Sequence, residues 1–184
     1  MTFLSDDEWF KAMLNAEDAI LAYNASKIEK FFVTIEMDGQ PFRVRIYKGG
    51  DTNNKALVLL SGYVFALRNS HFFDNLAKKY NLFVIEQGSF GLNSRPESCS
   101  GSKSPDKSEE WMIDFLDKVI QMLDLPEKFL VLGYSMGCHN ASLLSTRQSE
   151  RIEAFMAVCP SGFESAEDAG YDLERMPIPS AWNP

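Results

Sequence analysis

The sequence has little of what would place a protein in a membrane, in the secretory pathway or on nucleic acid. No apolar run among its 184 residues approaches the length of a membrane span, so no transmembrane segment is expected. The opening residues, MTFLSDDE, are acidic and lack the basic and apolar regions of a signal or transit peptide. Lys and Arg number 18 against 26 Asp and Glu, and the net charge of −8 excludes nucleic acid as a partner. We expect an intracellular, cytoplasmic protein.

Cysteine and histidine are also scarce, which removes several kinds of site. The three cysteines, Cys99, Cys138 and Cys159, are odd in number and have no C-x-x-C spacing. They are therefore expected to be reduced thiols rather than a disulfide framework or a zinc site. Neither a metal nor a cofactor is predicted.

What the sequence does contain is typical of one α/β domain. Hydrophobic residues make up 45% and charged residues 24%, as in a globular protein with a core. A helical apolar pattern precedes a hairpin signal, Asp38-Gly39, and strands then alternate with helices. That order predicts a mostly parallel sheet flanked by helices. The expected strands are 31–37, 42–47, 56–60, 82–85, 129–132 and 152–158, and helices are expected to about residue 23, at 70–79, at 108–123 and after residue 135.

The N-terminal amphipathic helix, assigned to residues 1–28, has two interpretations. Ser5 and Glu8 form a capping box, and apolar residues follow at helical spacing. A wide apolar stripe of this kind is typical of packing on the domain. A surface or partner-docking helix is the alternative.

The stretch FLVLGYSMGCHNASLLS, residues 129–145, predicts a strand, a tight turn and a helix with a serine at the apex. Gly133 and Gly137 flank Ser135 in the pattern G-x-S-x-G, where larger side chains would collide with the neighbouring strand or helix. Ser135 is thus predicted to be a nucleophile on a strained backbone, with the positive end of the following helix directed at it. A plain Gly-Ser loop between a strand and a helix is the alternative.

An acyl-transfer serine needs donors for the oxyanion that forms when an ester carbonyl is attacked. The backbone N–H of Met136 is the first candidate, because it follows the nucleophile. The second is expected in the loop after strand 56–60, where Gly62 permits a close turn. The N–H of Tyr63 is the best candidate there, with Val64 next.

The serine also needs a base, and the sequence offers no well-placed one. In this architecture the order along the chain is serine, acid and then histidine, with the histidine late. The only histidines are His71 and His139, and none follows residue 139. Surface or packing roles are expected for both.

Together these stretches resemble the N-terminal half of the α/β-hydrolase fold superfamily, over nearly the whole chain. The likeness is closest to the branch of the lysophospholipase and N-acyl-phospholipid lipase-like proteins and the lipid-droplet lipase co-activator. The sequence departs from that branch around the oxyanion loop and the nucleophile. Ser61 replaces a histidine before Gly62, and Val64, Phe65 and Ala66 replace the glycines after the oxyanion residue. Tyr134 replaces a histidine before the nucleophile, and Cys138 replaces a glycine after the G-x-S-x-G pattern. The matching stretches are 16–21 (AEDAIL), 59–63 (LLSGY), Glu86, 90–91 (FG), 94–96 (SRP), 133–137 (GYSMG) and 159–163 (CPSGF).

The resemblance implies a partial α/β-hydrolase core at 29–163 and the start of a cap or tail at 164–184. It implies a serine hydrolase-like protein that acts on lipid esters or amides through Ser135, truncated before the acid and the histidine. It also suggests a membrane or lipid-droplet surface as a location. A non-catalytic regulator or partner-binding protein of lipid metabolism is the alternative, and a fragment without independent function is a third.

Strand 152–158 is expected to be an open edge of the sheet, because the strands that follow in this architecture are absent from the sequence. It is apolar apart from Glu153 and contains no proline. Such an edge can pair with another chain. A protein partner, the tail from Ser161 onward or self-association is therefore expected to cover it.

Overall fold

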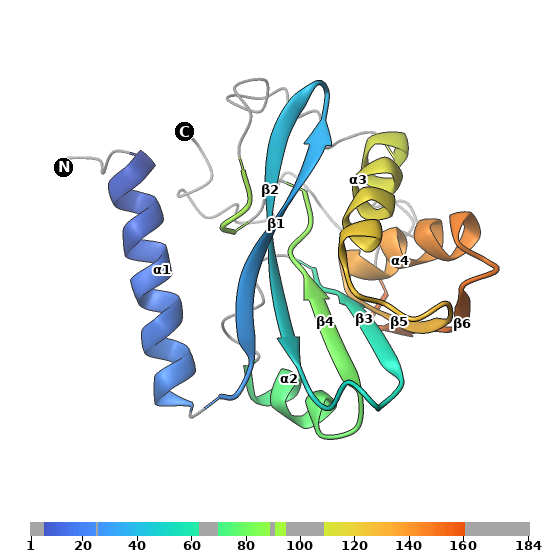
Figure 1. Cartoon of the computed structure of the whole chain (residues 1–184), viewed down its shortest axis with the longest axis horizontal. Coiled ribbons are helices and arrows are strands. Elements are labelled where there is room, and N and C mark those ends of the chain that lie inside the picture. The colour runs from blue at the N-terminus through green and yellow to red at the C-terminus, as the bar shows by residue number, and fades with distance from the viewer. Residues whose placement is uncertain (1–5, 25, 63–69, 89–90, 95–108, 161–184) are drawn as a thin grey trace, which may run out of the picture.

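The computed structural model describes residues 6–24, 26–62, 70–88, 91–94 and 109–160 (Figure 1). The six strands form one sheet in the order β1-β2-β4-β3-β5-β6. β1 and β2 are antiparallel to their neighbours, while β3, β4, β5 and β6 are parallel, so the predicted mostly parallel sheet is confirmed. The elements are α1 (Asp6–Tyr23), β1 (Glu29–Met37), β2 (Gln40–Gly49), β3 (Ala56–Leu60), α2 (Ser70–Ala77), β4 (Asn81–Ile85), α3 (Glu109–Met122), β5 (Phe129–Tyr134), α4 (Met136–Arg147) and β6 (Ile152–Val158).

The hairpin between β1 and β2 turns at the predicted Asp38-Gly39 pair. Both residues have positive φ, at 52° and 74°, and Met37 faces Gln40 across the turn. Two consecutive positive φ values match the right-handed twist of paired strands, which explains why Asp-Gly is favoured at this point.

Both faces of the central strands are buried, because helices cover each of them. Side chains alternate along a strand, so Val58 and Leu60 of β3 point to one face and Leu57 and Leu59 to the other. The first pair joins a core with α3 and α4, and the second pair packs with Phe73 of α2. Strands that are buried on both faces have continuous apolar sequences, such as ALVLL in β3.

The helix α3 corresponds to the helix expected at 108–123. Its buried residues recur at helical spacing, and Phe115 packs edge-on against Phe42 of β2 with ring centroids 5.7 Å apart. Ser108, the first residue of the expected helix, lies outside the described residues. The buried residues of α3 are Met112, Phe115, Leu116, Val119 and Ile120.

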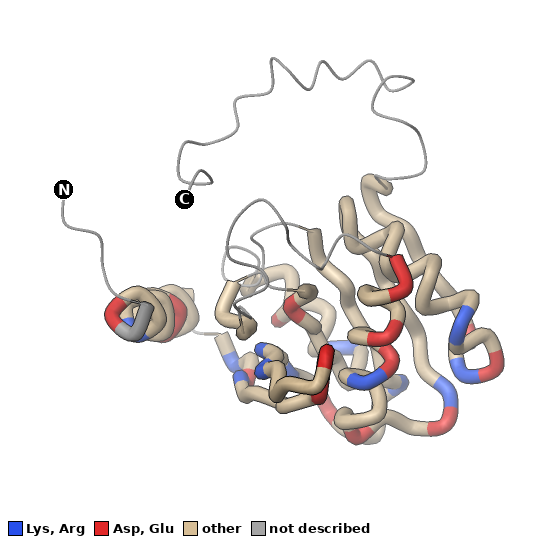
Figure 2. The backbone as a smooth tube through the Cα atoms, turned by 90° about the horizontal axis from the view of Figure 1, so that it is seen from above, with Lys and Arg blue, Asp and Glu red and all other residues tan. Residues whose placement is uncertain are grey.

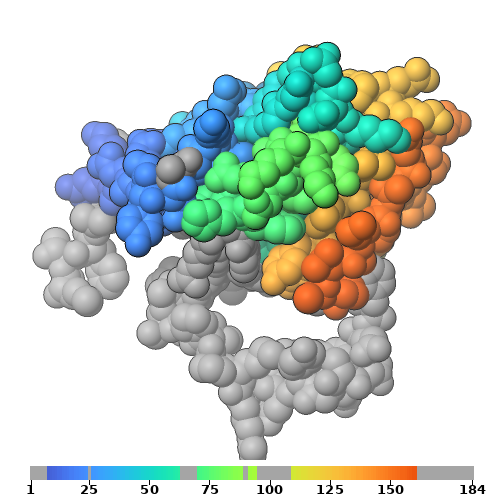
Figure 3. All heavy atoms as spheres, turned by 90° about the horizontal axis from the view of Figure 1, so that it is seen from below, coloured from blue at the N-terminus to red at the C-terminus, as the bar shows by residue number. Residues whose placement is uncertain are grey.

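β6 forms one edge of the sheet, as predicted, and lies at the opposite end of the molecule from α1 (Figure 3). Its residues are exposed or half-buried along their whole length. Phe155 is 37% exposed and Met156 is 60% exposed. The tail from Ser161 onward, one of the covers expected for this edge, lies outside the described residues.

Charged residues of both signs are interspersed along the described parts of the chain (Figure 2). No helix within these parts combines the length and the apolar composition needed to cross a bilayer.

Candidate functional site

Ser135 lies in the turn between β5 and α4, where the sequence predicts it. Its backbone has φ 54° and ψ −127°, a conformation that residues other than glycine rarely adopt. The Ser135 N–H donates to the Val158 carbonyl at 3.0 Å, and the Cys138 N–H donates to the Ser135 carbonyl at 2.9 Å. These bonds hold a strained residue in place at the carboxyl end of β5.

The two glycines of the G-x-S-x-G pattern leave the space in which this turn forms. A Cβ at Gly133 would lie 2.5 Å from Cys138 Cα, within the turn itself. A Cβ at Gly137 would lie 2.6 Å from the carbonyl carbon of Leu60 and closer still to its oxygen. Because these neighbours are backbone atoms, the first turn of α4 can rest on the end of β3 only with glycine at position 137.

Gly62 brings the turn after β3 against Ser135. A Cβ at Gly62 would lie 2.9 Å from Ser135 Cβ and 3.2 Å from its Oγ. Met136 is the first residue of α4, so its N–H belongs to the first turn, where helical donors have no helical acceptor. Tyr63, the other predicted oxyanion donor, lies outside the described residues. The structure thus brings Ser135, Met136 and Gly62 together.

The two histidines lie on different helices, His71 on α2 and His139 on α4. His139 Nε2 lies 3.1 Å from Glu109 Oε1 of α3, on the surface of the domain. His71 is exposed on α2. Both positions agree with the surface or packing roles expected from the sequence.

The cysteines of the described part of the chain are free thiols with different surroundings. Cys138 is fully buried, and its Sγ lies 3.4 Å from the Val158 carbonyl oxygen. Burial raises the pKa of the Cys138 thiol. Cys159 is exposed, and Cys99 lies outside the described residues. Within the described ranges, no group of three or more His, Cys, Asp or Glu side chains is placed to hold a metal ion.

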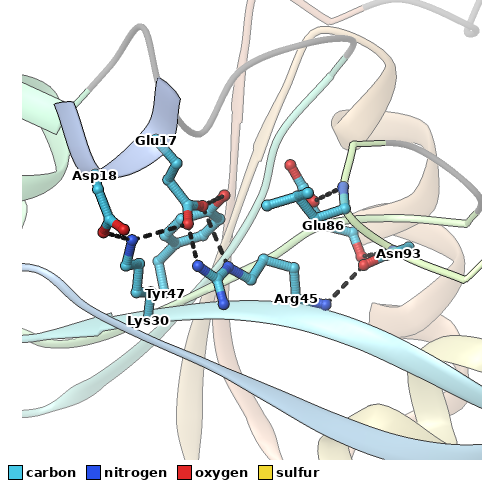
Figure 4. A network of polar contacts seen from close by, with 8 residues as sticks. Glu17, Asp18, Lys30, Arg45, Tyr47, Glu86 and Asn93 are labelled. Atoms are coloured by element: carbon cyan, nitrogen blue, oxygen red, sulfur yellow. Dashed lines mark hydrogen bonds and ion pairs between the residues drawn. The ribbon is translucent and has the colours of Figure 1, made fainter. Parts of the chain in front are cut away.

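A buried ionic cluster attaches α1 to the sheet, and the sequence patterns did not predict it (Figure 4). Glu17 is fully buried and accepts hydrogen bonds from Tyr47 Oη at 2.6 Å and from Arg45 Nε at 3.2 Å. The Nη2 atom of Arg45 donates to the other carboxylate oxygen of Glu17, Oε2. Lys30 Nζ lies 3.2 Å from the same oxygen. The helix therefore packs on the β1–β2 hairpin through a carboxylate that is satisfied from several sides.

Glu86, at the carboxyl end of β4, lies on the other side of Arg45 in Figure 4. Its carboxylate accepts a hydrogen bond from the Leu92 N–H at 2.9 Å. Burial, together with the nearby Glu17 charge, raises the pKa of Glu86 to about 7. The Leu92 hydrogen bond and Arg45 act in the opposite direction.

This pKa predicts a pH dependence of folding. The folded state holds the Glu86 proton more tightly than the unfolded state, so its stabilising contribution is present below the ordinary pKa of 4.5 and is lost as pH rises through about 7. From about pH 5 to about pH 8 the free energy of unfolding should fall by on the order of 2 kcal/mol relative to Glu86→Gln. Urea unfolding of both proteins across this range measures the difference, and parallel pH profiles would contradict the prediction.

Comparison with known proteins gives consistent matches. The sequence pattern of the α/β hydrolase fold family matches residues 55–177. A probable 1-acylglycerol-3-phosphate O-acyltransferase of Oryza sativa subsp. japonica is 32% identical over 120 residues, which cover 62% of this chain and 27% of that protein. The 1-acylglycerol-3-phosphate O-acyltransferase of Arabidopsis thaliana is 30% identical over 118 residues, covering 61% and 27%. The match therefore spans about a quarter of these curated relatives.

Among solved structures, a probable hydrolytic enzyme from Pseudomonas aeruginosa PAO1 superposes with a TM-score of 0.66 at 20% identity. The superposition covers 79% of this chain and 46% of that one. At this identity the likeness concerns the fold, and it agrees with the sheet order and helix placement described above.

Proposed function

The chain belongs to the α/β-hydrolase fold family, and on that premise we propose that it acts on lipid esters by acyl transfer through Ser135. The observation that carries the proposal is the position of Ser135 on a positive-φ turn, with its hydroxyl beside Gly62. The plant relatives support the substrate class, because both are named for acyl transfer on an acylated glycerol phosphate.

In the proposed reaction, Ser135 Oγ attacks the carbonyl carbon of the ester and passes its proton to a base. The carbonyl oxygen becomes an oxyanion, which the N–H groups of Met136 and Tyr63 stabilise. The C–O bond to the alcohol then breaks, the alcohol leaves with the proton, and an acyl-serine remains. Water or another alcohol takes the acyl group in a second step and restores Ser135.

The finer assignment we propose is the lysophospholipase and N-acyl-phospholipid lipase branch, with the protein working at a lipid surface. The sequence stretches quoted above support this branch. The base and its orienting acid would come from outside the 184 residues.

A non-catalytic regulator is the second candidate, and one observation favours it. The His139 imidazole is paired with Glu109, and His71 is exposed on another helix, so neither supports Ser135 as a base in the described structure. In that case the turn at Ser135 would bind a lipid or a partner protein without catalysing a reaction.

The test is covalent labelling of Ser135 with a fluorophosphonate, with and without added imidazole as an external base. A serine without a base is a weak nucleophile, so we expect slow labelling that imidazole accelerates by about 10-fold or more. Ser135→Ala should abolish labelling, while Ser142→Ala, on the same helix, should label like the wild type. If the Ser135→Ala variant is labelled as fast as the wild type, the proposal that Ser135 is the nucleophile is wrong.

We also propose that β6 is covered by another polypeptide. Its exposed Phe155 and Met156 and its free edge support this proposal. The purified chain should therefore self-associate as its concentration rises, and Met156→Lys should reduce the association, because an edge lysine opposes pairing. Size-exclusion chromatography with light scattering measures both, and a wild-type monomer at all concentrations would contradict the proposal.

A further inference from the structure

Two buried amide side chains join the elements that meet at Ser135. Gln87, just after β4, donates from Nε2 to the main-chain carbonyl of Ser61, just after β3. Asn140, on α4, donates from Nδ2 to Gln87 Oε1 at 2.7 Å. Gln87 is 3% exposed and Asn140 is 7% exposed, so both bonds are shielded from water. One glutamine thus connects the turn after β3 to the helix that follows Ser135.

The direction of both hydrogen bonds follows from the acceptor at one end. A main-chain carbonyl only accepts, so Gln87 must present its NH₂ group to Ser61. The Gln87 carbonyl then faces Asn140, which must present its own NH₂ group. Each amide therefore has a single orientation. Removal of either partner leaves a buried polar group unpaired, which is costly in a buried site.

The carbonyl that Gln87 holds belongs to the peptide group between Ser61 and Gly62. Because a peptide group is planar, fixing this carbonyl also fixes the direction of the Gly62 N–H and the point at which Gly62 begins. A Cβ at Gly62 would lie 3.2 Å from Ser135 Oγ, so this backbone is in contact range of the hydroxyl. Rotation of the peptide would therefore change the surface that faces Ser135.

We propose that Gln87 is a positioning residue for the acyl-transfer site and that Asn140 holds Gln87 in its orientation. Through Ser61, the pair sets the backbone of the turn after β3 beside Ser135. The turn leads directly into Tyr63, the proposed oxyanion donor. This assignment rests on the proposed function of Ser135, and it adds two residues that belong to no sequence motif.

The test compares Gln87→Met, Asn140→Leu and the double variant with the wild type and with Gln148→Met. The control is a glutamine at the end of α4 that donates to Asp117 at 2.8 Å, away from Ser135. Each protein is measured for fluorophosphonate labelling of Ser135 in imidazole, for its melting temperature and for the ¹⁵N–¹H chemical shift of Gly62.

Gln87→Met should label about 100-fold more slowly, the size of effect that a displacement of about 1 Å has at a catalytic site. The double variant should recover part of the lost melting temperature, because it leaves no unpaired amide at position 140, but its labelling should stay slow, because the Ser61 carbonyl still lacks Gln87. The Gly62 shift should change in both. Labelling that recovers together with the melting temperature would overturn the proposal and leave a purely structural role.

The nuclear magnetic resonance signal separates this proposal from the proposed function. If the wild type does not label, the proposed function fails, yet a Gly62 shift that moves in Gln87→Met and not in Gln148→Met still supports positioning of the turn. An unchanged Gly62 shift in Gln87→Met overturns the positioning role, whatever the wild-type labelling rate.

Discussion

Gly137→Ala is expected to destabilise the fold by about 3 kcal/mol, because an added Cβ there has no space. It would lie 2.6 Å from the carbonyl carbon of Leu60 and 3.0 Å from that of Ser61. These are backbone atoms of β3 and its following turn, so relief requires moving α4 away from the sheet. The melting temperature should fall by roughly 6–12 °C for a domain of this size. Differential scanning calorimetry measures the change.

Gly39→Ala is the matched control for this substitution. Gly39 has φ 74°, but nothing lies within 4 Å of its added Cβ. Its cost should therefore be conformational strain alone, about 1 kcal/mol. If Gly137→Ala melts at the same temperature as Gly39→Ala, the close approach of α4 to β3 is not what fixes glycine at position 137.

The second large effect is expected for Glu17→Gln, which removes one charge from the buried cluster of α1. Arg45 is 3% exposed and would keep its charge without a carboxylate partner on α1. Removing one partner of a buried pair typically costs about 3–5 kcal/mol, because the other charge remains away from water. Urea unfolding should show this loss as a lower midpoint with little change in slope.

Glu153→Gln serves as its control, because the Lys55–Glu153 pair lies on the surface with Nζ and Oε2 2.8 Å apart. Exposed pairs contribute little, so its midpoint should match the wild type. The pair Glu17→Leu with Arg45→Met removes both charges and should recover part of the loss. Equal midpoints for Glu17→Gln and Glu153→Gln would show that α1 does not depend on the ionic cluster.

The strands and the serine turn could be predicted because their signals are local. β3 and β6 have the bounds that their apolar runs indicate, 56–60 and 152–158. β5 extends two residues beyond the predicted strand, to Tyr134, because its ladder with β6 continues through Gly133 and Tyr134. An apolar run shows that a strand is present, but pairing with the neighbouring strand decides where the ladder ends.

The polar contacts around the site could not be predicted in the same way. Arg45 alternates with Val44 along a strand, and alternation does not show that a helix bearing Glu17 covers the Arg45 side. Gln87 and Asn140 are 53 residues apart and belong to no spacing pattern. A buried pair of this kind depends on how the elements are placed in space, and a single sequence has no periodicity that records it.

The order of strands in the sheet also governs how the fold can form while the polypeptide is being synthesised. β3 can pair with β4 once residue 85 has been made, but its other neighbour, β5, is complete only at residue 134. During the synthesis of α3, one side of β3 therefore has no partner, although all five of its residues are buried in the finished sheet. An unpaired apolar strand in a nascent chain can pair with the wrong strand or be bound by chaperones. β5, the strand that ends at the serine turn, is also the second neighbour of β3. The central part of the sheet and the serine turn are therefore completed in the same stretch of synthesis.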